Sequence, residues 1–204
     1  MLALLMSMVG AQSYAYNAKI DGIYYNFSGN EATVTHSHSS DDLIGYFSDY
    51  HGNIIIPEYV SYEGKSYKVT KIGHLAFNTS YSLPSVTIPK SIKKIEGYAF
   101  REVTAIYISD LTAWLNIYFT NYYWIESQHR LYLNGKEITD LVIPQGTTYI
   151  DLALKKCSSL ISVTIPEGIT EIGKYRFYGC TNLKRITLPS TLEEIGEYAF
   201  YYCI

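Results

Sequence analysis

A 23-residue pattern repeats in the C-terminal part of the chain. Its members reappear 23 positions later: Ile165-Pro166 as Leu188-Pro189, Ile172-Gly173 as Ile195-Gly196, Tyr175 as Tyr198, Phe177 as Phe200 and Cys180 as Cys203. A fixed period of this length is typical of a solenoid, in which similar coils stack on one another. The repeat therefore argues against a compact enzyme domain.

The same pattern can be followed toward the N-terminus with interruptions. Ile88-Pro89 and Ile143-Pro144 mark two earlier coils. The first coil begins at Ile56-Pro57, where an insertion over residues 61–69 delays the Ile72-Gly73 pair and Phe77. We expect five coil starts in a solenoid over residues 54–204.

Each coil is predicted to begin with a short strand. In Val163-Thr164-Ile165 the aliphatic side chains alternate with an outward threonine, and Pro166 ends the strand because proline cannot donate a ladder hydrogen bond. One short helical turn is expected near 175–180. The predicted core positions are Ile165, Ile172, Phe177, Cys180, Leu188, Ile195 and Phe200.

The block from Ser158 to Cys180 resembles the BspA-type leucine-rich repeat of bacterial surface and secreted proteins. The resemblance covers roughly residues 54–204. It implies a mainly β solenoid with short helical turns that serves as an extracellular adhesion or recognition scaffold. It also implies protein ligands, host matrix glycoproteins among them, and no catalytic residues.

The middle of the array departs from the pattern. Residues 109–137 form an irregular, aromatic insert, and Leu131-Tyr132-Leu133 followed by Asn134-Gly135 predicts a hairpin whose second strand covers 138–143. Arg176 stands where the other coils carry alanine. If that position faces the core, the arginine must reach outward or strain the coil.

The N-terminal residues are predicted to have two roles. Residues 1–13 resemble a signal peptide that lacks its positive segment, so we expect the native start to lie upstream and the protein to be secreted or held at the bacterial cell surface. Residues 14–53 are expected to form a β-rich hairpin cap on the first coil. The last coil ends at Ile204 before another strand, so we expect the C-terminus to be uncapped.

Composition narrows the function further. A net charge of −3 with 17% charged residues argues against nucleic-acid binding, and the apolar N-terminal run is too short to be transmembrane. Cys157, Cys180 and Cys203 lie 23 residues apart and are predicted to be buried free thiols, with disulfide pairing as the alternative. The sequence carries no nucleophile elbow, phosphate loop or zinc motif, so we predict no enzyme and no cofactor.

One cluster of potential metal ligands has a second interpretation, as a solvated loop. It consists of His36, His38, Asp41, Asp42 and His51. Histidines two residues apart in a strand share a face and can bind a divalent cation. Serine and aspartate richness favours the loop, and no metal site is predicted.

Two surfaces are candidates for ligand binding. The insert supplies Trp114, Tyr122, Tyr123 and Trp124, because insertions in repeat proteins often lie on the binding face. The outward strand positions supply Tyr107, Thr164 and Thr187. A protein ligand is the first hypothesis. A glycan stacked on the tryptophans, or a structural spacer that binds nothing, are the alternatives, and core packing of the aromatic residues also stays open.

Overall fold

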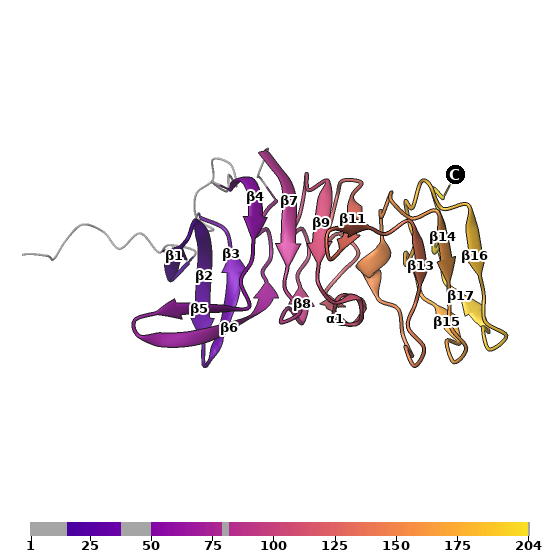
Figure 1. The fold of residues 1–204 in the computed structure, drawn as a ribbon, viewed down its shortest axis with the longest axis horizontal. Coiled ribbons are helices and arrows are strands. Elements are labelled where there is room, and N and C mark those ends of the chain that lie inside the picture. Colours follow the sequence, from indigo (N-terminus) through magenta and orange to yellow (C-terminus); the bar gives the residue numbers. More distant parts are fainter. Residues whose placement is uncertain (1–15, 38–49, 79–81, 204) are drawn as a thin grey trace, which may run out of the picture.

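A computed structural model describes residues 16–37, 50–78 and 82–203 of the 204-residue chain. The described chain is an elongated stack of coils, with the N-terminal strands at its left end and the last coil at its right end (Figure 1). Most coils contribute one strand to a sheet on one side of the solenoid and a second strand to a sheet on the other side. The predicted signal peptide, residues 1–13, lies outside the described residues.

The first strands of successive coils form two parallel sheets on one side of the solenoid. The longer sheet contains β4 (His51–Ile55), β7 (Ser82–Ile88), β9 (Ala105–Ile108) and β11 (Arg130–Leu133), with β12 (Lys136–Glu137) antiparallel at its edge. The shorter sheet contains β13 (Asp140–Val142), β14 (Ser162–Thr164) and β16 (Arg185–Thr187).

The other side of the solenoid also carries two sheets. The seven-stranded sheet contains β1 (Ala18–Ile20), β2 (Ile23–Ser28), β3 (Glu31–Thr35), β5 (Tyr59–Tyr62), β6 (Lys65–Ile72), β8 (Lys94–Ile95) and β10 (Tyr118–Phe119). The two-stranded sheet contains β15 (Glu171–Ile172) and β17 (Glu194–Ile195). Helical structure among the described residues is limited to α1 (Leu111–Leu115) and the 3-10 helix η1 (Leu152–Leu154).

The N-terminal strands cover the edge of the first coil. β2 and β3 pair as an antiparallel hairpin around Gly29, and β3 continues as a parallel neighbour of β6. The insertion predicted at 61–69 is the β5–β6 hairpin, which turns at Glu63 and Gly64, both with positive φ. The backbone groups of β6 are therefore paired on both sides, as a cap requires.

The core lies between the two sets of sheets. Phe77, Phe100 and Phe177 are fully buried, and the rings of Phe177 and Phe200 stack with centroids 5.3 Å apart. Of the predicted core residues, Ile165, Ile172, Phe177 and Cys180 are buried, and Phe200 is partly buried against them.

The prediction that Leu188 and Ile195 are core residues is wrong for this structure. Their side chains are 42% and 50% exposed, respectively. Both belong to the last coil, so their equivalents Ile165 and Ile172 are covered by the following coil whereas these two are not. A core position of one coil becomes buried only when the next coil packs on it, and the residue pattern of a single coil does not show whether that happens.

The segment after each second strand is a turn of repeated shape and not the expected helical turn. Tyr98, Tyr175 and Tyr198 occupy equivalent positions and all have φ near +60°: 57°, 62° and 57°. A left-handed residue interrupts helical geometry, which explains why 175–180 forms hydrogen-bonded turns only. At Gly196 a side chain would meet the backbone of Lys174 at 2.6 Å, so glycine permits the close approach of neighbouring coils.

The insert at 109–137 continues the stack. β10 pairs in parallel with β8, and β11 pairs in parallel with β9, while α1 begins at Leu111 with Asp110 as its N-cap. The predicted hairpin is present as β11–β12 around Asn134-Gly135. The second strand differs from the predicted range 138–143, however. The strand that pairs with β11 is the shorter β12, and residues 140–142 form β13, which pairs with β14 in the next sheet.

On both sides of the solenoid, one sheet ends and the next begins at the same level of the stack. On one side the longer sheet ends with β12 and the shorter one begins with β13; on the other side the seven-stranded sheet ends with β10, and β15 and β17 form a separate pair. We call this level the sheet break. It separates a block that ends with the β11–β12 hairpin from a block that begins with β13.

Candidate ligand-binding surface

Both tryptophans of the insert are buried. Trp114 is 1% exposed and Trp124 is not exposed at all, and their rings meet edge to face with centroids 6.0 Å apart. Trp124 also donates a hydrogen bond from Nε1 to the carbonyl oxygen of Leu152, at 3.1 Å. The prediction that these tryptophans bind ligand is therefore wrong, and the glycan hypothesis loses its stacking platforms. Packing, the alternative reading of the aromatic insert, holds for both rings.

Tyr122 and Tyr123 are at the surface but belong to a column of tyrosines in the turns. Tyr123 is 45% exposed and stacks on Tyr98 at 5.3 Å, whereas the half-buried Tyr122 stacks on Tyr175 at 4.6 Å. Lys155 lies beneath them and donates a hydrogen bond to the carbonyl oxygen of Tyr122. Burial lowers the pKa of Lys155 to about 8. These contacts use much of the ring surface for packing between coils.

The outward side chains of the first strands form a row on each of the two sheets. Strand register aligns Ile55, Thr87, Tyr107 and Tyr132 across the longer sheet, and Val142, Thr164 and Thr187 across the shorter one. The rings of Tyr107 and Tyr132 stack with centroids 4.6 Å apart. We call these seven residues the sheet row.

Two members of the sheet row are large apolar side chains directed to solvent: Ile55 is 71% and Val142 is 69% exposed. Thr164 and Thr187 are also exposed. The structure thus brings Tyr107, Thr164 and Thr187 onto one side of the solenoid. Tyr122 and Tyr123 are not among them, because they follow β10 of the opposite sheet.

Arg176 reaches a charged partner inside the solenoid. Its guanidinium Nη1 lies 3.1 Å from Oδ1 of Asp151, and both side chains are only 11% exposed. Asp151 also accepts a hydrogen bond from the backbone N–H of Leu152, at 2.7 Å, and thereby caps η1. The arginine therefore neither reaches solvent nor needs to strain the coil, because an acidic residue of the preceding coil pairs with it.

The sheet break opens two adjacent grooves next to the β11–β12 hairpin. The first groove has a volume of about 390 Å³ and lies between β12 and β13; its apolar lining consists of Leu111, Leu133, Ile138, Leu141 and Val142. Lys136, Glu137, Thr139 and Asp140 complete it. We call it the apolar groove.

The second groove, of about 380 Å³, lies on the other side of Glu137 and Thr139, which line both. Its remaining lining is Arg130, Ser158, Ser159, Ile161, Asn182 and Lys184. We call it the polar groove. The sequence analysis missed both grooves, although the Asn134-Gly135 turn was a signal. A tight hairpin adds an antiparallel strand at the edge of a parallel sheet, and the parallel pairing of successive coils stops there.

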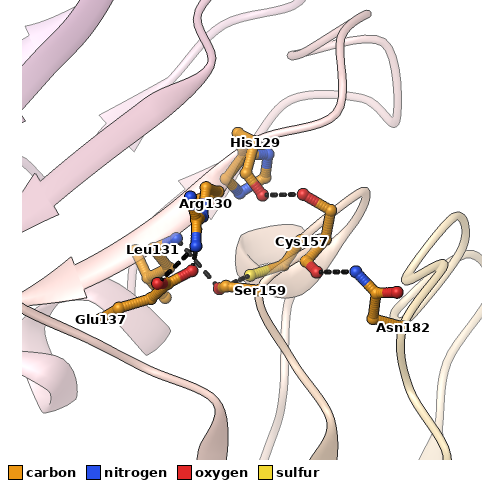
Figure 2. Close-up of polar contacts among 8 residues, drawn as sticks. His129, Arg130, Leu131, Glu137, Cys157, Ser159 and Asn182 are labelled. Carbon is orange, nitrogen blue, oxygen red and sulfur yellow. Dashed lines mark hydrogen bonds and ion pairs between the residues drawn. The ribbon is translucent and has the colours of Figure 1, made fainter.

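Hydrogen bonds hold the polar groove in shape (Figure 2). Nε and Nη2 of Arg130 each lie 2.6 Å from a carboxylate oxygen of Glu137, and Asn182 donates to the carbonyl oxygen of Ser158 at 2.8 Å. Ser159 accepts from the backbone N–H of Leu131 at 3.1 Å and thereby ties β11 to the next coil. The groove is therefore built from side chains on three successive coils.

The cysteine column sits behind this groove. The three thiols are free; Cys157 and Cys180 are buried, and the Cys180 thiol donates to the carbonyl oxygen of Leu154 at 3.1 Å. Burial raises the pKa of Cys157 to about 11. His129 pairs in register with Cys157 and is itself fully buried, with both ring nitrogens lacking a hydrogen-bond partner among the described residues. Burial lowers the pKa of His129 to about 3.

The proposed metal ligands are only partly described. His38, Asp41 and Asp42 lie outside the described residues, whereas His36 and His51 lie within them. Among residues 16–37, 50–78 and 82–203, no three histidine, cysteine, aspartate or glutamate side chains gather in a way that could hold a metal ion. In the same part of the chain, no helix is both long and apolar enough to cross a membrane.

A comparison with models of protein families identifies the family to which this architecture belongs. The model of the BspA type leucine rich repeat region matches residues 58–150 and 125–204, with six copies. The chain belongs to this family. The two matched ranges overlap across the insert, so the coil that departs from the 23-residue pattern is still part of the repeat array. A search of curated proteins finds no significant relative.

Similar chains are found among solved structures. A leucine rich cell surface protein of Faecalibacterium prausnitzii is similar over 93% of this chain and 52% of its own, with 22% identity and a TM-score of 0.53. A leucine-rich repeat protein of Bacteroides ovatus aligns over 92% of this chain and 57% of its own, with 20% identity and a TM-score of 0.42. The chain spans little more than half the length of these two proteins. At such identities the first likeness establishes the repeat fold and nothing more.

Proposed function

We propose that this chain is a secreted or cell-surface scaffold that binds a protein ligand through its sheet row. The observation that carries the proposal is the row itself: seven outward side chains, in register within each of the two sheets, with two stacked tyrosines and two exposed aliphatic side chains. Tyrosine and exposed aliphatic groups supply the apolar contact area on which protein interfaces rely. The family, a group of repeat scaffolds, is consistent with binding in place of catalysis.

A protein ligand accounts for the site better than a glycan does. A solenoid side presents a broad and nearly continuous surface, which suits a partner that buries several hundred square ångströms per side. A glycan needs an exposed aromatic face, and both insert tryptophans are buried. Host matrix glycoproteins are the first candidates, as the family resemblance suggests.

Binding of the full chain to immobilised matrix glycoproteins, measured by biolayer interferometry beside a glycan array, tests the proposal. Tyr107→Ala is expected to weaken protein binding about tenfold, since an interface tyrosine of this kind contributes on the order of 1.4 kcal/mol or more. Tyr118→Ala is the matched control, because Tyr118 is 59% exposed on the opposite sheet.

Three results would contradict the proposal: no saturable binding to any matrix protein by folded material, binding to glycans alone, or equal loss of affinity in both tyrosine variants. The first result would favour a structural spacer.

A further inference from the structure

We propose that the apolar and polar grooves together bind an extended peptide segment of the protein ligand, with an aliphatic side chain in the apolar groove and an acidic side chain in the polar groove. This inference rests on the proposed function and specifies one part of its surface. The two grooves adjoin, since Glu137 and Thr139 line both. Val142 connects them to the sheet row, because it lines the apolar groove and aligns with Thr164.

The apolar groove has the chemistry of a side-chain pocket. Aliphatic groups from α1, β11 and β13 meet there, and Val142 at its margin is 69% exposed. A volume of about 390 Å³ lies at the low end of the range for ligand pockets. Burying one leucine or valine side chain removes apolar surface from water on both partners, which is the main source of affinity at such a site.

The walls of the apolar groove are strand edges that lack a neighbour. In the β11–β12 hairpin, Ile138 N–H bonds to the Leu131 carbonyl, so the peptide groups of Glu137 point away from β11. On the other wall, Ile143 N–H bonds to the Thr164 carbonyl, so alternate peptide groups, those of Val142 included, point away from β14. An extended peptide can pair with such edges while its side chains enter the groove.

Charge selects an acidic peptide. The two grooves are lined by three basic residues, Arg130, Lys136 and Lys184, and by two acidic ones, Glu137 and Asp140. The carboxylate of Glu137 is held by Arg130, and Asp140 lies 3.7 Å from Arg185 and accepts a hydrogen bond from Ser162. Lys184 has no ion-pair partner among the described residues. Its ammonium group is therefore available to a carboxylate from the partner.

The inference can be tested with labelled eight-residue peptides of serine and threonine that contain one leucine and one glutamate, separated by one to four residues. Fluorescence anisotropy with the full chain measures their affinity. Two variants address the two grooves: Val142→Trp fills the apolar groove, and Lys184→Glu reverses the free charge. Tyr118→Trp and Lys93→Glu are their controls, because Tyr118 is 59% exposed on the opposite sheet and Lys93 is exposed outside both grooves.

We expect saturable binding of at least one leucine–glutamate peptide and none of the matched peptide with serine for leucine. Val142→Trp should abolish binding, and Lys184→Glu should weaken it about fivefold, which corresponds to one exposed ion pair. The two controls should bind as the unaltered protein does, and all four variants should keep its thermal transition, because the substituted side chains are at the surface.

Absence of saturable peptide binding, or equal losses in Val142→Trp and Tyr118→Trp, would overturn the inference. Matrix-protein binding distinguishes this failure from failure of the proposed function. A protein ligand that Tyr107→Ala releases and Lys184→Glu retains would leave the sheet row as the binding surface and exclude the paired grooves, because Lys184 lines the polar groove and is not part of the sheet row.

Discussion

Replacing the buried histidine with leucine should make the protein less sensitive to acid. His129 is fully buried, and its ring nitrogens lack hydrogen-bond partners among the described residues. The folded chain keeps the ring neutral, and burial, with a smaller contribution from the charge of Lys156, lowers its pKa from 6.5 to about 3. His129→Leu removes both the unpaired nitrogens and the titration.

The sign of the effect follows from proton uptake. Below pH 6.5 the unfolded chain binds a proton at this histidine that the folded chain does not bind until about pH 3, so stability falls with acid across that window. At about 1.4 kcal/mol per pH unit, lowering the pH from 6.5 to 5 costs roughly 2 kcal/mol. At pH 7 the leucine variant should already be more stable by about 1 kcal/mol, because two unpaired polar atoms are gone.

Urea denaturation at pH 7 and pH 5 measures the difference. Far-UV circular dichroism is the suitable probe, since the His129 ring lies 5.8 Å from that of Trp124 and its replacement would alter fluorescence directly. Carboxylates contribute the same pH dependence to both proteins and cancel in the comparison. His51→Leu, at an exposed position, should behave as the unaltered protein does. If the unaltered protein and the His129→Leu variant lost the same stability between pH 7 and pH 5, the reasoning would be refuted.

Three further predictions concern the core. Phe177→Ala should lower the free energy of unfolding by about 3 to 5 kcal/mol because it empties a fully buried position; a loss below about 1 kcal/mol in urea titration would contradict this. Arg176→Ala restores the alanine of the repeat yet should cost about 3 kcal/mol, since it leaves Asp151 charged and unpaired, and adding Asp151→Asn should recover much of the loss in thermal unfolding. A thiol reagent should label Cys203 in the native protein and all three cysteines after denaturation, and rapid native labelling of the two buried thiols would be unexpected.

The repeat itself was predictable because each coil carries its own strand and turn signals. Val163 and Ile165 are buried and Thr164 is exposed, as strand alternation requires. The Asn134-Gly135 hairpin was also visible, since a two-residue turn with positive φ at both positions depends on local chemistry alone.

Properties that depend on the neighbouring coil were not predictable in this way. Ile195 has the pattern of a core residue and is half exposed, whereas Arg176 has the pattern of a misfit and is paired with Asp151, 25 positions earlier. The tryptophans of the insert illustrate the same limit. The sequence alone is consistent with either binding or packing for Trp114 and Trp124. They are buried because β10 and β11 stack on the earlier coils around them.

The sheet break also has a mechanical consequence. In a solenoid pulled along its axis, each joint between coils transmits the same force, so the joint with the fewest backbone hydrogen bonds yields first. Here neither set of sheets crosses the joint between β12 and β13, which is bridged instead by one isolated β-bridge, His129 to Cys157, and by side-chain contacts such as Ser159 to Leu131 and Trp124 to Leu152. We expect a chain anchored at one end and loaded at the other to part into two intact blocks, and a ligand lodged in the grooves at that joint would strengthen it where it is weakest.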